Sequence, residues 1–119
     1  MLNNANGFSA VYLVTGYTDL RRGLDGLASI IEKNFKLDPY QKNVLFLFCG
    51  RRSDRIKGLV FEGDGFLMLY KRLEAGRFTW PRSESEALHI SHQQYVWLME
   101  GLSIEQKKLI PQVKPKRIA

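Results

Sequence analysis

The stretch from residue 50 to residue 81 constrains the fold most, because two apolar runs flank the turn Gly63-Asp64-Gly65 within it. An Asp-Gly pair between such runs is a strong hairpin signal, since glycine adopts positive φ without penalty. We expect one strand over about 55–62 and a second over about 66–73. The sequence therefore predicts a β-hairpin at the centre of the fold.

A two-residue loop around Asp64 would sort the side chains of the hairpin onto two faces, because successive strand residues point to opposite sides. The apolar face, suited to a core, would carry Ile56, Gly58, Val60, Leu67, Leu69 and Leu73. The other face would carry Arg55, Lys57, Leu59, Phe61, Met68, Tyr70 and Arg72. This second face would bring Lys57 close to Arg72, a repulsion that a fold tolerates in solvent or relieves with a bound anion.

The remaining pattern predicts further strands over 10–15, 43–49 and 88–90, and a short one over 76–80. A first helix, with an apolar stripe at helical spacing, should begin at a cap formed by Thr18 or Asp19. Ser91 and Gln94 have the spacing of a capping box and should open a second helix. We expect an α+β fold, a small mostly antiparallel sheet with a central hairpin and two packed helices.

The composition fits a single globular domain, with 119 residues, of which 45% are hydrophobic and 25% are charged. We expect a flexible lead-in over 1–9, one domain over 10–104 and a basic tail over 105–119. The single cysteine, Cys49, excludes an internal disulfide framework and fits a reducing cytoplasm. No stretch resembles a signal peptide or reaches the length of a membrane span.

The net charge of +6 indicates an anionic partner, and DNA is the partner we expect. The hairpin region interleaves cations with aromatic side chains, a mixture suited to phosphate contacts and stacking. The candidate nucleic-acid contacts are Arg51, Arg52, Arg55, Lys57, Lys71, Arg72 and Arg77, with Arg21 and Arg22 in the expected first helical turn. The alternative, that these cations only form a solvated rim, remains open.

No catalytic pattern is found in the sequence, which lacks a phosphate-binding Walker loop, an HExxH motif and a glycine-flanked serine elbow. His89 and His92 lie near each other, but no cysteine or cluster of carboxylates accompanies them. Asp54 and Asp64 have structural explanations rather than the converging arrangement of a metal-dependent nuclease. We therefore expect no enzymatic activity, no metal and no cofactor.

Several ordered motifs between about residues 11 and 102 resemble a known family. They are Tyr12-Leu13, Gly16-Tyr17-Thr18-Asp19-Leu20-Arg21-Arg22-Gly23-Leu24-Asp25-Gly26-Leu27, Leu45-Phe46-Leu47-Phe48-Cys49-Gly50-Arg51-Arg52-Ser53-Asp54-Arg55-Ile56-Lys57, Gly63-Asp64-Gly65-Phe66, Lys71-Arg72-Leu73-Glu74-Ala75-Gly76-Arg77-Phe78 and Trp80-Pro81. This pattern resembles the TnpB-type accessory proteins of bacterial insertion sequences, the small second-reading-frame proteins of the insertion-sequence-sixty-six family.

The resemblance implies a role in transposition, alongside a DDE-type transposase and a second accessory protein of the same element. It supplies no catalytic residues. The leading hypothesis is a non-catalytic, nucleoid-associated protein that binds DNA through the basic face of the hairpin. The alternative is a protein–protein adaptor for the transposase, which would dock through exposed Phe61, Tyr70 and Trp80. Whether the chain forms a homo-oligomer stays open.

Overall fold

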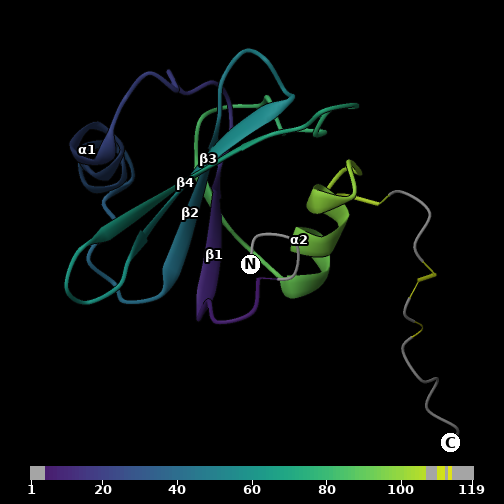
Figure 1. The fold of residues 1–119 in the computed structure, drawn as a ribbon. Coiled ribbons are helices and arrows are strands. Elements are labelled where there is room, and N and C mark those ends of the chain that lie inside the picture. The colour runs from purple at the N-terminus through teal and green to yellow at the C-terminus, as the bar shows by residue number, and fades with distance from the viewer. Residues whose placement is uncertain (1–4, 107–109, 112, 114–119) are drawn as a thin grey trace, which may run out of the picture.

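The computed structural model describes residues 5–106, 110–111 and 113, and its centre is a five-stranded sheet in the order β4-β3-β2-β1-β5 (Figure 1). The elements in chain order are β1 (Ala10–Val14), α1 (Leu24–Phe35), β2 (Val44–Cys49), β3 (Arg55–Phe61), β4 (Phe66–Arg72), β5 (Ala87–Ile90) and α2 (His92–Met99). The β1–β2 pair is parallel, and the other three strand pairs are antiparallel. The expected α+β fold with a mostly antiparallel sheet is confirmed.

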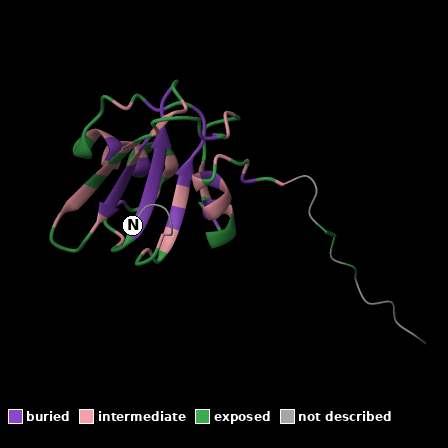
Figure 2. Cartoon of the chain, turned by 45° about the vertical axis from the view of Figure 1, so that its right-hand side comes forward, coloured by how far each residue is buried: buried purple, intermediate pink, exposed green. Residues whose placement is uncertain are grey.

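The two helices cover opposite faces of the sheet, so the central strand β2 is buried on both sides (Figures 1 and 2). On one face, Leu27 and Ile31 of α1 pack with alternate residues of β2 in one core cluster. On the other face, Tyr95 and Leu98 of α2 belong to a second cluster that contains the intervening β2 residues. This arrangement explains why β2 is apolar at every position rather than alternating.

The hairpin has the predicted two-residue loop. The Glu62 N–H donates to the Gly65 carbonyl at 2.8 Å, and Gly63 has a φ of +100°. In this register Lys57 pairs with Tyr70, and Arg55 pairs with Arg72. The predicted sorting of side chains onto two faces is therefore confirmed, and the cations that oppose each other directly are Arg55 and Arg72.

The first helix starts later than predicted, at Leu24, and its N-cap is Gly23 without a side-chain cap. Asp19 does not cap the helix, because its carboxylate accepts hydrogen bonds from the backbone N–H and the guanidinium of Arg21, both at 3.0 Å. The expectation that Arg21 and Arg22 occupy the first helical turn is wrong. Both residues lie in the loop that precedes α1.

The expected short strand over 76–80 does not form. The segment instead contributes side chains to the α2 face of the core, where Phe78 and Trp80 are buried. The Trp80 indole N–H donates to the Val14 carbonyl at 2.9 Å, which satisfies its one polar atom. The expectation that Trp80 is exposed is therefore wrong.

The C-terminal part of the domain follows the prediction. Strand β5 lies at the edge of the sheet, and Ser91 and Gln94 form the capping box that opens α2. The five cations expected in the tail, Lys107, Lys108, Lys114, Lys116 and Arg117, lie outside the described residues. Over the described ranges, no helix is long and apolar enough to cross a membrane. The division into lead-in, domain and tail stays a prediction.

Candidate functional site

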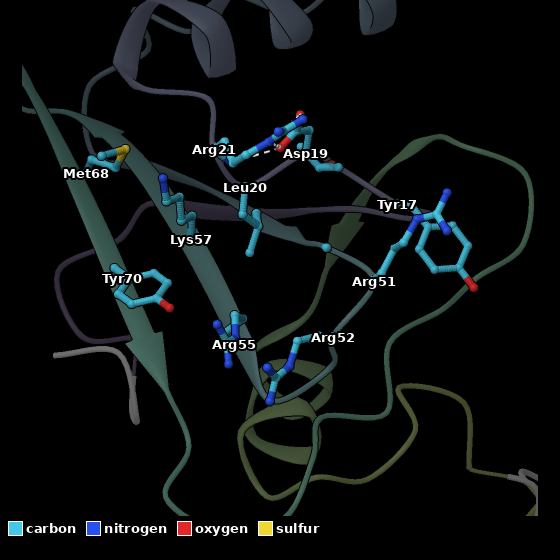
Figure 3. A pocket seen from close by; sticks show the side chains of 12 residues that line it. Tyr17, Asp19, Leu20, Arg21, Arg51, Arg52, Arg55, Lys57, Met68 and Tyr70 are labelled. Carbon is cyan, nitrogen blue, oxygen red and sulfur yellow. Dashed lines mark hydrogen bonds and ion pairs between the residues drawn. The ribbon is translucent and has the colours of Figure 1, made fainter.

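A groove lies between the loop before α1, which connects β1 to that helix, and the part of the hairpin face that α1 leaves uncovered (Figure 3). Its volume is about 910 Å³. We call it the basic groove, and it is lined by Tyr17, Thr18, Asp19, Leu20, Arg21, Gly50, Arg51, Arg52, Arg55, Lys57, Met68 and Tyr70. It combines residues from the loop before α1, the turn after β2, and both hairpin strands.

Gly50 allows the loop before α1 to approach the end of β2. The Thr18 N–H donates to the Cys49 carbonyl at 2.9 Å, which fixes the loop against the strand end. A Cβ at position 50 would lie 3.2 Å from the Thr18 carbonyl oxygen and 3.3 Å from Leu20 Cγ. Such contacts are crowded, so glycine is the residue that fits this junction best.

Arg82 also connects these two segments. Its guanidinium donates to the Gly16 carbonyl at 2.7 Å and to the Gly50 carbonyl at 2.6 Å. The guanidinium carbon also lies 4.2 Å from the centroid of the Tyr17 ring, within cation–π distance. The sequence carries no local signal for the role of Arg82, because its partners lie 66 and 32 residues away.

The structure brings together five of the nine predicted nucleic-acid contacts, and these are Arg21, Arg51, Arg52, Arg55 and Lys57. The other four, Arg22, Lys71, Arg72 and Arg77, do not line the groove. Lys71 pairs with the buried Ile56, so it belongs to the opposite face of the hairpin. The predicted set therefore divides into a clustered group and a dispersed group.

Two carboxylates partly balance this positive charge. Asp54 pairs with Arg55 at 3.0 Å and with Arg52 at 3.3 Å. The hydrogen bond from Arg55 is the main reason that the pKa of Asp54 lies below its ordinary value. Asp19 likewise pairs with Arg21 at 2.8 Å, and hydrogen bonds from Arg21 hold its pKa well below the usual range. Both acids therefore remain ionised at neutral pH.

Arg51 and Lys57 have no ion-pair partner among the described residues. Arg51 is exposed on the turn after β2. The Lys57 ammonium donates to the Arg22 carbonyl at 3.1 Å, which holds it above the hairpin face without neutralising it. These two cations leave the groove with uncompensated positive charge, which an anion can neutralise.

The groove also exposes large aromatic and apolar side chains. Tyr17 and Tyr70 are 64% and 54% exposed, and Met68 is 36% exposed. Of the three aromatic residues predicted to mediate protein contacts, only Tyr70 lines the groove. Phe61 instead packs at the tip of the hairpin, where its ring centroid lies 5.2 Å from that of Tyr40 and 5.1 Å from that of Phe66.

The described residues offer no arrangement for metal chemistry, since no group of three or more His, Cys, Asp or Glu side chains could hold an ion. Asp54 is engaged by two arginines, and Asp64 lies in the hairpin loop. The Cys49 thiol is buried, and this burial raises its pKa, so it is a poor nucleophile.

Residues 9–109 match the family model described as IS66 Orf2 like protein. The chain belongs to this family. The family assignment expected from the motifs is confirmed, and this IS66 Orf2-like protein is accordingly an accessory protein of an insertion sequence. The loop before α1 and the turn after β2, which carry the longest of those motifs, build the groove together with the hairpin strands.

Two relatives of this IS66 Orf2-like protein come from Sinorhizobium fredii (strain NBRC 101917 / NGR234). The protein called uncharacterized protein y4hO is 39% identical over 92 residues, which cover 77% of this chain and 79% of the relative. Uncharacterized protein y4jC is 31% identical over 109 residues, which cover 92% of both chains. No solved structure matches the chain.

Proposed function

We propose that this protein is a non-catalytic accessory factor in transposition that binds DNA through the basic groove. The observation that carries the proposal is the convergence of five cations from separate segments on one concave surface beside exposed tyrosines. Arginine and lysine side chains neutralise DNA phosphates, and these contacts supply essentially all of the nonspecific affinity.

The groove cations differ in whether they already form an ion pair, and this difference sets the role that we propose for each. Arg51 and Lys57 have no ion pair among the described residues, so each can neutralise a phosphate without giving up a carboxylate. Arg55 is held by Asp54 and is only 25% exposed, so it offers a positioned guanidinium. Arg22, Arg72 and Arg77 would act as secondary contacts outside the groove lining, whereas Lys71, on the opposite face of the hairpin, would contact DNA only if the DNA extended beyond the groove.

The test compares two variants that lose the same charge. The groove variant carries Arg51→Ala, Arg52→Ala and Lys57→Ala. The matched variant carries Lys33→Ala, Lys36→Asn and Lys42→Ala, three exposed positions outside the groove. Asparagine is chosen at position 36 because that residue has a φ of 56°, which asparagine tolerates. Binding is measured by fluorescence anisotropy with labelled DNA.

We expect the groove variant to bind DNA roughly tenfold or more weakly than the wild type, because charge-assisted contacts are lost. The matched variant should stay closer to the wild type. Equal affinities for both variants, with circular dichroism showing both folded, would contradict the proposal. A comparison of the element's terminal sequence with unrelated DNA would show whether binding depends on sequence.

An adaptor role for the transposase is the second candidate, and the aromatic cluster at the hairpin tip favours it. Tyr40 is 56% exposed there and packs against both Phe61 and Phe66. Exposed aromatic side chains are common anchors of protein interfaces. Co-purification with the DDE-type transposase or the second accessory protein, after nuclease treatment and in high salt, would support this role. If Tyr40→Ala no longer co-purifies with the partner protein, the aromatic cluster at the hairpin tip is the contact site.

A further inference from the structure

Tyr17 and Tyr70 border the basic groove from two different elements. Tyr17 comes from the loop after β1, and Tyr70 comes from the edge strand β4. Figure 3 shows them well apart, with Arg51 beside Tyr17 and with Arg52 and Arg55 lower in that view. Each is more than half exposed, although both lie next to cations. Their positions place two aromatic surfaces at separate points along a cationic surface.

Both rings have a fixed neighbour. The Arg82 guanidinium lies 4.2 Å from the Tyr17 ring centroid and is itself anchored by the Gly16 and Gly50 carbonyls. Tyr70 stands opposite Lys57 in the strand register, and it also interacts with Arg55. An exposed ring that is held in place loses little conformational freedom on binding, which favours its use as a stacking surface.

The face of an aromatic ring is of little use against a DNA duplex, because paired bases stack on one another and present only their edges in the grooves. Unpaired bases expose their faces, and proteins that bind single strands combine a cationic groove with aromatic residues that stack on the bases. A volume of about 910 Å³ lies within the range of sites that enclose a small ligand, so it has room for a few nucleotides.

We propose that the basic groove binds unpaired DNA, with Tyr17 and Tyr70 stacking on bases while Arg51, Arg55 and Lys57 contact the phosphates. This inference rests on the proposed DNA-binding function and specifies the form of DNA that the groove recognises. Unpaired DNA is exposed wherever strands separate or a strand end frays. Arg82 serves as a positioning residue, because it holds Tyr17 rather than facing the phosphates.

The test measures binding of one labelled oligonucleotide as a single strand and as a duplex with its complement. We expect the single strand to bind more tightly. Tyr70→Ala and Tyr17→Ala should each weaken single-strand binding by roughly 5-fold to 150-fold, the range for one lost stacking contact. Tyr70→Phe keeps the ring and should stay close to the wild type. Tyr40→Ala is the matched control, because Tyr40 is 56% exposed but lies outside the groove.

The outcomes separate this inference from the proposed function. Preference for the duplex, or single-strand affinity unchanged in both Tyr17→Ala and Tyr70→Ala, would overturn the stacking inference. If the groove variant still lost affinity in that case, the DNA-binding function would stand. Absence of binding to either form of DNA would contradict the proposed function, and the inference would fall with it. Thermal unfolding of each variant confirms that it is folded.

Discussion

At the scale of single residues, the shape of the groove depends on side chains that do not face its centre. Gly50 allows the loop before α1 to reach the end of β2, and Arg82 binds carbonyls on both segments. These residues fix the positions of Tyr17 and Arg51 before any ligand arrives. Preorganisation of this kind raises affinity by lowering the entropy lost on binding.

Cys49 provides a test of how tightly this junction is packed. Its thiol is buried beneath the turn after β2, and burial raises its pKa, so little thiolate forms at pH 8. Because the thiolate is the reactive species, we expect slow alkylation of the native protein by iodoacetamide. Alkylation should become rapid after unfolding in urea. Mass spectrometry measures the rate of alkylation in each state. Equal rates in the folded and the unfolded protein would contradict the burial of Cys49.

The five groove cations are among the nine candidates that the sequence offers, because clustered arginines beside a hairpin are a local signal, but the sequence does not separate them from the other four. The burial of Trp80 could not be predicted, since it depends on the Val14 carbonyl, which lies 66 residues away in the chain. The role of Arg82 likewise depends on the distant carbonyls of Gly16 and Gly50. In both cases the hydrogen-bond partner is distant in the sequence, so the neighbouring residues do not indicate the contact.

At the scale of elements, short sequence motifs correctly predict the elements whose structure depends on neighbouring residues. The Asp-Gly turn set the hairpin register, and the capping box opened α2. The start of α1 was misplaced, because Asp19 satisfies Arg21 in a turn before the helix rather than capping it. The hydrogen bond from the Thr18 N–H to the Cys49 carbonyl holds this loop against the end of β2.

The capping box gives a prediction at this scale. Ser91→Ala removes the side-chain acceptor for the Gln94 N–H, so it should lower the free energy of unfolding by about 1 kcal/mol. Ser91→Asp keeps an acceptor and should restore most of the stability. Ser29→Ala makes the same chemical change inside α1, where alanine is favoured, and should not destabilise. Urea denaturation, monitored by circular dichroism, measures the stability of the three variants. Equal urea midpoints for Ser91→Ala and the wild type would contradict the role of the cap.

At the scale of the whole molecule, the groove results from how the helices divide the sheet. Helix α1 covers the hairpin face around Leu59 and Phe66 and leaves the end with Arg55, Lys57 and Tyr70 open. The parallel β1–β2 pair brings the loop before α1 beside that open end. The fold class could be predicted, but the groove could not, because it exists only where three segments meet.

The measurement that tests the central claim most directly is the salt dependence of DNA binding by the wild type, the groove variant and the matched variant. Each phosphate contact contributes about 0.7 to the slope of log K against log salt for single strands and about 0.9 for duplexes. We predict that the groove variant, which loses two or three phosphate contacts, has a slope shallower by about 1.4 to 2.7, and that the matched variant keeps the slope of the wild type. Parallel lines for all three proteins would show that the phosphates are bound elsewhere, and would contradict the account.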